Sequence, residues 1–332
     1  MIDQLIERAE GYQAHKVDFT QSTENMHFEP MNCGLVLEGG VGNTVLQPTD
    51  YAFGQVYSRL GPVALGGSKS LPREYMEKCP DLLRSINLNH WMARMNPATW
   101  FVRAYDDRAR AVLSDRFSAV DALDCLKWTK EALDSQKYAY KFHNVTVTPD
   151  YMRMSISMKE LKVPDGGKNK GTGGVYAIGC DLGTGEIGNA KIWCNPYVQR
   201  TSCTNSIVYS ESDYSYQHRH VGIRENLART FMVCVFNALK GCEEVLQTLV
   251  KSIEEPLPKI EEIIGDMAKR NGWSQELSYG VAMGTEGESS LWGLVQGVSY
   301  AANLIDNPED QLKMQQLAGD LLMRQPAYIT EL

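Results

Sequence analysis

The chain has 332 residues, 43% of them hydrophobic, and carries a formal net charge of −8 with a pI near 5.4. A chain of this length can bury one large hydrophobic core or two ordinary ones. Because an acidic surface does not attract polyanions, any site for nucleic acid has to be a local groove. The first residues lack a signal-peptide pattern, and no apolar stretch approaches the roughly 20 residues that span a bilayer. We therefore expect a cytoplasmic protein with no membrane partner.

Residues 1–112 predict an N-terminal α/β region. Residues 1–50 combine glycine turns with short apolar runs, which indicates irregular or short-stranded structure. Residues 50–60 and 81–95 have helical spacing, and the second segment stops before Pro97 because the residue ahead of a proline disfavours the helix. Residues 98–104 have the composition of a strand.

Residues 113–255 are expected to form a core of helix, meander and long helix. Ser118 and Asp121 have the spacing of a capping box ahead of a helix of about four turns. Two strands follow, separated by a break at residues 148–150, and the second alternates in polarity. We expect its methionine-rich face to be buried and its other face to meet solvent. The buried face would hold Met152, Met154, Ile156 and Met158, and the solvent face Tyr151, Arg153, Ser155 and Ser157.

More strands are predicted at about 175–181, 190–194 and 197–209, followed by a long amphipathic helix over residues 221–253. Pro256 and Pro258 end this helix, and Gly241 is a candidate kink. Residues 256–332 predict a C-terminal helical region with helices at 260–270 and 291–304. The predicted fold class is α+β: an antiparallel β-meander packed by a long helix, with additional N- and C-terminal helical segments.

Three basic residues, Arg219, His220 and Arg224, precede or open the predicted long helix. A helix N-terminus has partial positive charge and unpaired N–H groups, so basic residues there cost stability unless an anion binds. The pattern therefore predicts a phosphate site. The alternative is that these side chains simply extend into water.

Aromatic residues lie close to these basic groups, as in proteins that hold single-stranded nucleic acid by stacking, worth about 1–3 kcal/mol per base. Half-buried tyrosines at a sheet edge would give the same pattern. The nucleic-acid-binding residues predicted from the sequence are Arg108, Arg110, Arg116, Arg153, Arg200, Tyr214, Tyr216, Arg219, His220 and Arg224.

Two other classes of function stay open. A metal-dependent nuclease or other hydrolase could use Asp115, Glu186, Asn205 and His220, with Asp181 as a further acidic candidate. No strand carries the closely spaced carboxylates that such metal sites use, so capping and turn roles are favoured. An interaction protein that inhibits a host factor would also suit an acidic surface. The eight scattered cysteines favour free thiols, and the sequence indicates no metal and no other cofactor.

Over about residues 50–325 the chain resembles the phage and plasmid proteins grouped as the domain of unknown function numbered 932. Where that family often has Asn-Gly, this chain has Asn205-Ser206, and Gln296-Gly297 replaces a common Asn-Ala. The resemblance is carried by the segments at 87–91, 110–116, 185–188, 196–197, 203–205, 291–301 and by His220.

The resemblance implies a protein that is encoded by a mobile genetic element and acts in the host cytoplasm. The order of helix, meander and long helix is similar to the core of the RecT, Red-beta and Erf single-strand annealing proteins, which is an analogy of fold alone. Together these observations predict a protein that binds single-stranded DNA and promotes annealing as a homo-oligomeric ring or filament, without nucleotide hydrolysis.

Overall fold

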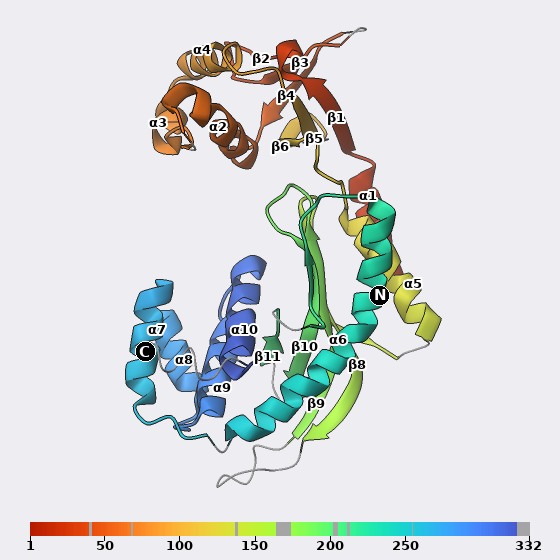
Figure 1. The fold of residues 1–332 in the computed structure, drawn as a ribbon, viewed down its shortest axis with the longest axis vertical. Coiled ribbons are helices and arrows are strands. Elements are labelled where there is room, and N and C mark those ends of the chain that lie inside the picture. The colour runs from red at the N-terminus through yellow and green to blue at the C-terminus, as the bar shows by residue number, and fades with distance from the viewer. Residues whose placement is uncertain are drawn as a thin grey trace.

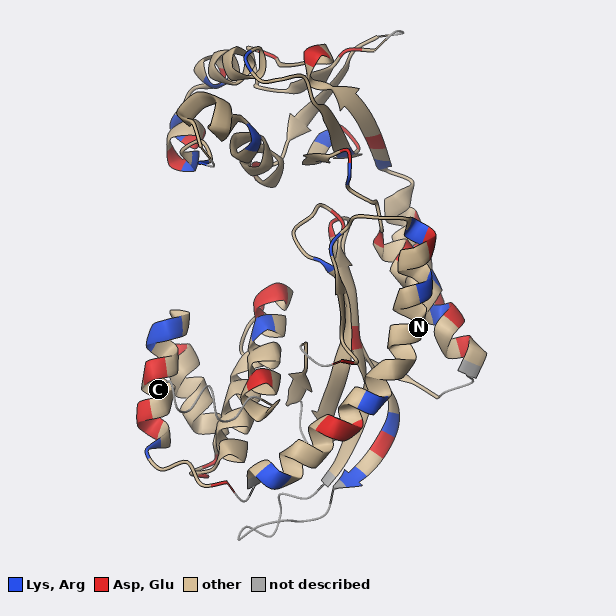
Figure 2. Ribbon diagram, in the orientation of Figure 1, with Lys and Arg blue, Asp and Glu red and all other residues tan. Residues whose placement is uncertain are grey.

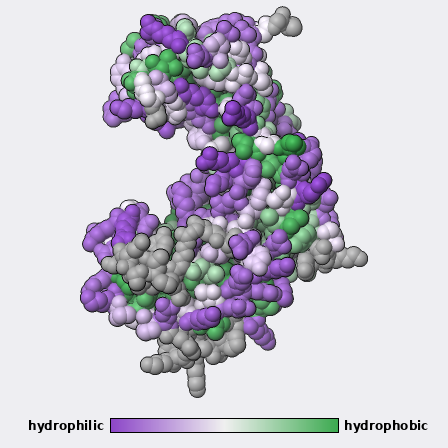
Figure 3. Space-filling view, viewed as in Figure 1, coloured by the Kyte–Doolittle hydropathy of each residue, from purple (hydrophilic) through white to green (hydrophobic). Residues whose placement is uncertain are grey.

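The structure, a computed structural model, describes residues 1–39, 42–67, 69–136, 139–163, 174–201, 205–210, 213–253 and 255–323. It confirms the α+β class: a mixed six-stranded sheet is followed by an antiparallel meander, the long helix and a C-terminal helical segment (Figure 1). The surface is deeply hollowed between the N-terminal sheet unit and the C-terminal helices (Figure 3). No helix of the described ranges is long and apolar enough to cross a bilayer.

The N-terminal unit is a sheet in the order β1-β5-β6-β4-β3-β2, in which β4 and β6 are parallel. Apolar residues such as Val102 on the sheet and Val56 and Leu60 on the helix above it form its core. The short strands predicted within residues 1–50, the strand at 98–104 and the two helices are confirmed. The strands are β1 (Lys16–Ser22), β2 (Met26–Phe28), β3 (Leu35–Leu37), β4 (Thr44–Pro48), β5 (Thr99–Tyr105) and β6 (Arg108–Ser114), and the helices are α2 (Asp50–Leu65), α3 (Arg73–Lys78) and α4 (Asp81–Met92).

The meander consists of long antiparallel strands, with the predicted break at residues 148–150 between β7 and β8. Two short strands share one edge of β10: β11 pairs at Tyr197–Gln199 and β12 at Ile192–Cys194. Sequence analysis split β10 in two, but it runs through Pro196 as one strand. The strands are β7 (Lys141–Val147), β8 (Tyr151–Val163), β9 (Gly174–Gly185), β10 (Ile192–Arg200), β11 (Ser206–Val208) and β12 (Tyr216–His218).

Helices α6 (Arg224–Ile253), α5 (Ala122–Gln136) and α1 (Ile2–Gln13) cover the methionine-rich face of the meander. Met152, Met154 and Ile156 are fully buried there against Phe231 of α6, so this part of the prediction is confirmed. At Gly241 a Cβ atom would lie 2.5 Å from the Pro196 Cγ atom, which makes this glycine the point where α6 packs directly on β10.

The opposite face of β8, predicted to meet solvent, is buried. Arg153 and Ser155 are 0% exposed, and Tyr151 is 6% exposed. Helix α10 (Pro308–Met323) covers this face, and the Arg153 guanidinium donates to the carbonyl of Pro308 and to the Gln315 side chain. The expectation of an open polar face is wrong, because polar side chains of α10 cover the polar face of the strand and hydrogen-bond to Arg153.

The C-terminal region also contains α7 (Ile260–Asn271), α8 (Gln275–Gly284) and α9 (Leu291–Ala302). The two helices predicted here correspond to α7 and α9, whereas α1, α3, α8 and α10 were not predicted. Serine side chains start two of them: Ser274 accepts from the Leu277 N–H and Ser290 from the Gly293 N–H. Such N-caps satisfy N–H groups that have no partner inside the helix.

The predicted capping box at Ser118 is wrong by one turn. Helix α5 begins at Ala122, and the Asp121 N–H donates to the Asp124 carboxylate at 3.0 Å. The Ser118 N–H instead donates to the His220 carbonyl at 2.8 Å. This segment therefore connects the N-terminal sheet to the loop that leads into α6.

Candidate functional site

Buried charges join the N-terminal sheet to the hairpin between β9 and β10. Glu186, whose side chain is 0% exposed, lies 2.5 Å from the Lys16 Nζ atom and 2.9 Å from the Arg110 Nη1 atom. The Arg103 Nη2 atom lies 2.7 Å from an Asp121 carboxylate oxygen. A bulge opposite Arg103 leaves Arg110 as the extra residue of β6, and such bulges redirect side chains.

The electrostatics of this cluster indicate a structural joint. Burial and the neighbouring Asp121 raise the pKa of Glu186. Burial opposes ionisation of Asp121 as well, but Arg103 and Lys16 lower its pKa overall. Buried charges persist only when they are paired this closely, since removing one partner leaves the other uncompensated. Arg110, predicted to contact phosphate, is committed to Glu186 instead.

His220 is also buried rather than open to an anion. It is 4% exposed, and its ring stacks on Phe117 with 4.8 Å between centroids. The two ring nitrogens lie 3.2 Å from the Ser118 carbonyl oxygen and 3.2 Å from the Thr184 hydroxyl. Burial lowers the pKa of His220 to about 4. A neutral, enclosed imidazole at pH 7 cannot neutralise a phosphate, so its predicted role is replaced by a structural one.

Arg153 and Tyr216 are likewise part of the interior. The Arg153 Nε atom donates to Asp181 at 3.0 Å, and the Trp193 indole N–H donates to the other oxygen of that carboxylate at 2.8 Å. Tyr216 is 9% exposed and packs edge-on against Phe231. Arg200 and Tyr214 are half-buried.

Arg108, Arg116, Arg219 and Arg224 are the predicted arginines that stay exposed. Arg116 and Arg219 flank the Ser118–His220 hydrogen bond, and within the described ranges neither side chain makes an ion pair or hydrogen bond. Arg224 opens α6 and pairs with Asp124. The loops at 115–118 and 218–224 thus hold two unpaired arginines and one paired arginine beside the start of α6, and we call this group the arginine loops.

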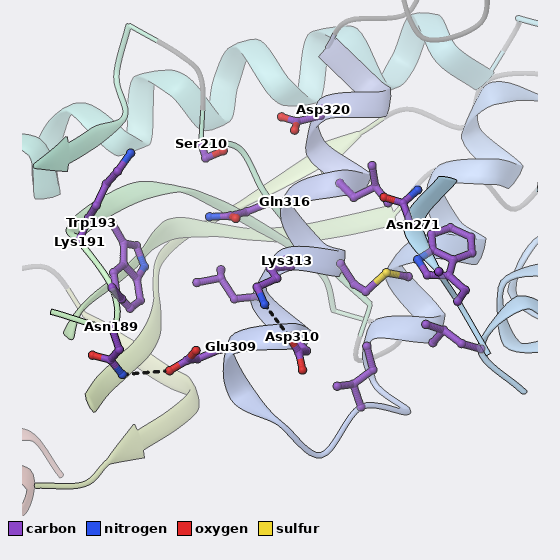
Figure 4. A pocket seen from close by; sticks show the side chains of 18 of the residues that line it. Asn189, Lys191, Trp193, Ser210, Asn271, Glu309, Asp310, Lys313, Gln316 and Asp320 are labelled. Atoms are coloured by element: carbon purple, nitrogen blue, oxygen red, sulfur yellow. Dashed lines mark hydrogen bonds and ion pairs between the residues drawn. The ribbon is translucent and has the colours of Figure 1, made fainter. Parts of the chain in front are cut away.

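A groove of about 980 Å³ lies between α10, the loop that connects α7 to α8, and the edge of β10; we call it the α10 groove. Figure 4 shows side chains from α10 pointing into it opposite Lys191 and Trp193, with Asn189 bonded to Glu309 and Lys313 paired with Asp310. Three carboxylates and two ammonium groups line it. Burial raises the pKa of Asp320 in this lining to about 6.

A smaller cleft of about 420 Å³ lies beside α2; we call it the α2 cleft. It is lined by Arg59, Arg73 and several hydroxyl groups, and none of its described lining residues is a carboxylate. The sequence was not interpreted as predicting a site here. The available signal was Tyr51, Gln55 and Arg59 at helical spacing on the polar face of a predicted helix.

The residues of the alternative hydrolase are not brought together. Asp115 is exposed, Glu186 is enclosed by Lys16 and Arg110, and Asn205 hydrogen-bonds to Gln296 at 3.1 Å in the C-terminal region. Among the residues that the structure describes, no group of three His, Cys, Asp or Glu side chains could hold a metal ion. Residues 202–204, which belong to the strand predicted at 197–209 and include Cys203, lie outside the described residues.

A scan of the chain against protein-family models found no match, and searches of curated proteins and of solved structures found no significant match either. The resemblance to the phage and plasmid family and the analogy to annealing proteins therefore stay predictions.

Proposed function

We propose that the protein binds single-stranded DNA through the arginine loops and promotes annealing, without nucleotide hydrolysis. One observation carries this proposal: Arg116 and Arg219 are exposed, have no side-chain partner among the described residues, and lie on two loops that are hydrogen-bonded together. Guanidinium groups recognise phosphate by paired N–H donors. Because Lys, Arg, Asp and Glu are interspersed over the rest of the fold (Figure 2), such contacts have to be local.

The Arg224–Asp124 pair fits the proposal as well. The Arg224 side chain is 55% exposed, and an ion pair at the surface contributes little to stability. Arg224 can therefore exchange a carboxylate for a phosphate at small cost. The partial positive charge at the start of α6 acts in the same direction.

Annealing requires two strands to meet, and we propose that a homo-oligomer brings them together. Strand β7 ends the meander and pairs only with β8 among the described strands. An edge strand of this kind is a template for pairing between subunits. Ile223 and Val233 are 64% and 52% exposed at the start and first half of α6, which offers further apolar contact area.

Fluorescence anisotropy with labelled oligothymidylate tests the proposal. Replacing both Arg219 and Arg224 by alanine should weaken binding and reduce the slope of log affinity against log salt by roughly 1.4 units, since each phosphate contact contributes about 0.7 on single strands. Lys240→Ala with Lys251→Ala removes the same charge from exposed positions on the distal half of α6 and should leave the slope unchanged.

Electron microscopy with and without the oligonucleotide tests the annealing part, with rings or filaments as the expected result. A flat salt titration of the wild-type protein, or a monomer under all conditions, would contradict the proposal. Magnesium- or manganese-dependent cleavage of the oligonucleotide that disappears in His220→Ala would favour the hydrolase instead.

A further inference from the structure

The α2 cleft combines positive charge with hydroxyl groups in a protein of net charge −8. The nearby carboxylates are Glu77, paired with Arg73 at 2.5 Å, and Asp50 and Glu309, which lie outside the lining. The α2 cleft is thus a basic pocket in an acidic molecule. Helix α2 lies on the side of the N-terminal unit that faces the hollow between the two ends of the molecule (Figure 1).

Arg59 is the central feature of the α2 cleft. Its Nη1 atom donates to the Gln55 carbonyl oxygen at 3.0 Å, and in the described part of the chain no carboxylate lies within ion-pair distance of its guanidinium. Burial lowers the pKa of Arg59, with a smaller opposing contribution from the neighbouring Tyr51. A partly desolvated cation that has no counter-ion among the described residues costs free energy. An anionic ligand would remove that cost.

The walls of the α2 cleft are fixed before any ligand binds. The Gln55 amide donates to the Ile187 carbonyl at 3.0 Å, and its oxygen accepts from the Val112 N–H at 2.7 Å. On the other side, a Cβ atom at Gly61 would lie 1.9 Å from the Lys69 carbonyl oxygen, so only glycine lets this segment approach α2. Preorganised donors lose little freedom when a ligand binds.

We propose that the α2 cleft binds the phosphate group of a small ligand, held by Arg59 and Arg73 and by the hydroxyls of Tyr51, Ser58 and Ser70. The Ser70 hydroxyl donates to the Ser58 hydroxyl at 3.2 Å, and both can rotate toward an acceptor. Among the described residues Arg73 is paired only with Glu77 on the same helix, and its side chain is 57% exposed, so it can turn to the ligand. The volume is within the range of small-ligand pockets, about 300–1,000 Å³.

Phosphate suits this lining better than a single carboxylate does. Its oxygens accept several hydrogen bonds in different directions, and the α2 cleft offers donors from α2, from α3 and from the segment at residues 69–71. The phosphate could belong to a free small molecule or to a DNA strand bound at the arginine loops. The proposal does not depend on DNA binding, and the experiment separates the two sources.

Isothermal titration calorimetry with inorganic phosphate, thymidine monophosphate and malonate is the first measurement. We expect saturable binding of both phosphate compounds and an affinity at least tenfold weaker in Arg59→Met. Tyr51→Phe, which removes one hydroxyl, should weaken binding severalfold. Arg94→Met is the control, because Arg94 is an exposed residue beyond α4 that contacts only His90 among the described side chains.

Each outcome decides the proposal. No saturation by either phosphate compound up to about 10 mM, equal affinity of Arg59→Met and wild type, or tighter binding of malonate than of phosphate would overturn it. Competition then identifies the source: if oligothymidylate displaces thymidine monophosphate, the site takes a strand phosphate, and if both bind together, it takes a free ligand. Both results support the site. The Arg219→Ala and Arg224→Ala double variant should retain phosphate binding even if DNA binding is lost.

Discussion

The α2 cleft and the α10 groove are two hollows of one acidic chain, yet their linings have opposite chemistry. Among the described residues, two arginines and no carboxylate line the α2 cleft, whereas Glu309, Asp310 and Asp320 line the α10 groove beside two lysines. In the α10 groove Lys313 is already paired with Asp310. The lining of a pocket, and not the net charge of the chain, therefore decides which ligand a pocket attracts.

The comparison extends to one arginine near each hollow, the buried Arg153 and the half-buried Arg59. Arg153 lies behind the α10 groove, bonded to the Asp181 carboxylate that also fixes the Trp193 side chain. Arg59 lines the α2 cleft, and within the described ranges its side chain hydrogen-bonds only to a backbone carbonyl. The charge of Arg153 is neutralised inside the fold, whereas the charge of Arg59 is available to an anionic ligand. The difference predicts a large loss of stability when Arg153 is replaced and almost none when Arg59 is replaced.

The largest expected effect is that of Arg153→Met. It leaves the fully buried Asp181 without its cation, and removing one partner of a buried ion pair costs about 3–5 kcal/mol. Urea unfolding followed by circular dichroism should show this loss in the free energy of unfolding. Arg59→Met should change it by less than about 0.5 kcal/mol, because no carboxylate loses a partner. Equal destabilisation by both substitutions would abolish the distinction between the two arginines.

A smaller effect is expected from His220, which lies at the joint between the two halves. Its pKa is about 4 in the folded chain against a reference value of 6.5, so the unfolded chain binds more protons between these values. Its contribution to stability is present above about pH 6.5 and is lost as the pH falls toward 4, by about 2–3 kcal/mol. His220→Gln should flatten this pH dependence.

An unchanged acid dependence in His220→Gln would mean that another buried group titrates in this range. Free energies of unfolding measured in urea at half-unit intervals of pH would reveal it. The result matters for function, because a histidine that stays neutral contributes no positive charge to phosphate binding at the arginine loops.

The periodicity of the sequence predicted α2, α4, α5, α6 and the meander, because burial of one face leaves a regular apolar pattern. It did not predict that the polar face of β8 is covered. In the sequence Arg153 and Ser155 have the polarity of solvent-facing residues. In the structure they are buried, and Arg153 hydrogen-bonds to Gln315 of α10. Polarity alone does not distinguish a residue in water from one inside a satisfied hydrogen-bond network.

The same limit applies to the candidate site. Arg110, Arg116 and Arg219 are equally basic in the sequence, but Arg110 meets Glu186 across 76 residues of chain while the other two find no partner among the described residues. Long-range pairing of this kind is fixed by the tertiary fold. The sequence therefore identifies the basic residues. The structure shows that Arg110 is paired inside the fold, while Arg116 and Arg219 have no partner among the described residues.

The smallest expected effect comes from Asp320 in the acidic lining of the α10 groove. Burial alone raises the pKa of Asp320 to about 6 from a reference value of 3.8. The folded chain then holds more protons than the unfolded chain between these values, so stability falls as the pH rises from about 4 to about 6. Asp320→Asn should remove this slope and stabilise the protein at pH 7 by ~1 kcal/mol, a value discounted for the partial exposure of the side chain.

Asp310→Asn is the matched control, because it removes the same charge from a paired carboxylate of the same groove and should give no gain at pH 7. Thermal unfolding of both variants at pH 4, 6 and 7 measures the difference. A loss of stability in Asp320→Asn at pH 7 would mean that its carboxylate has a cationic partner. In that event the α10 groove would be neutral rather than acidic, and its contrast with the α2 cleft would rest on the arginines alone.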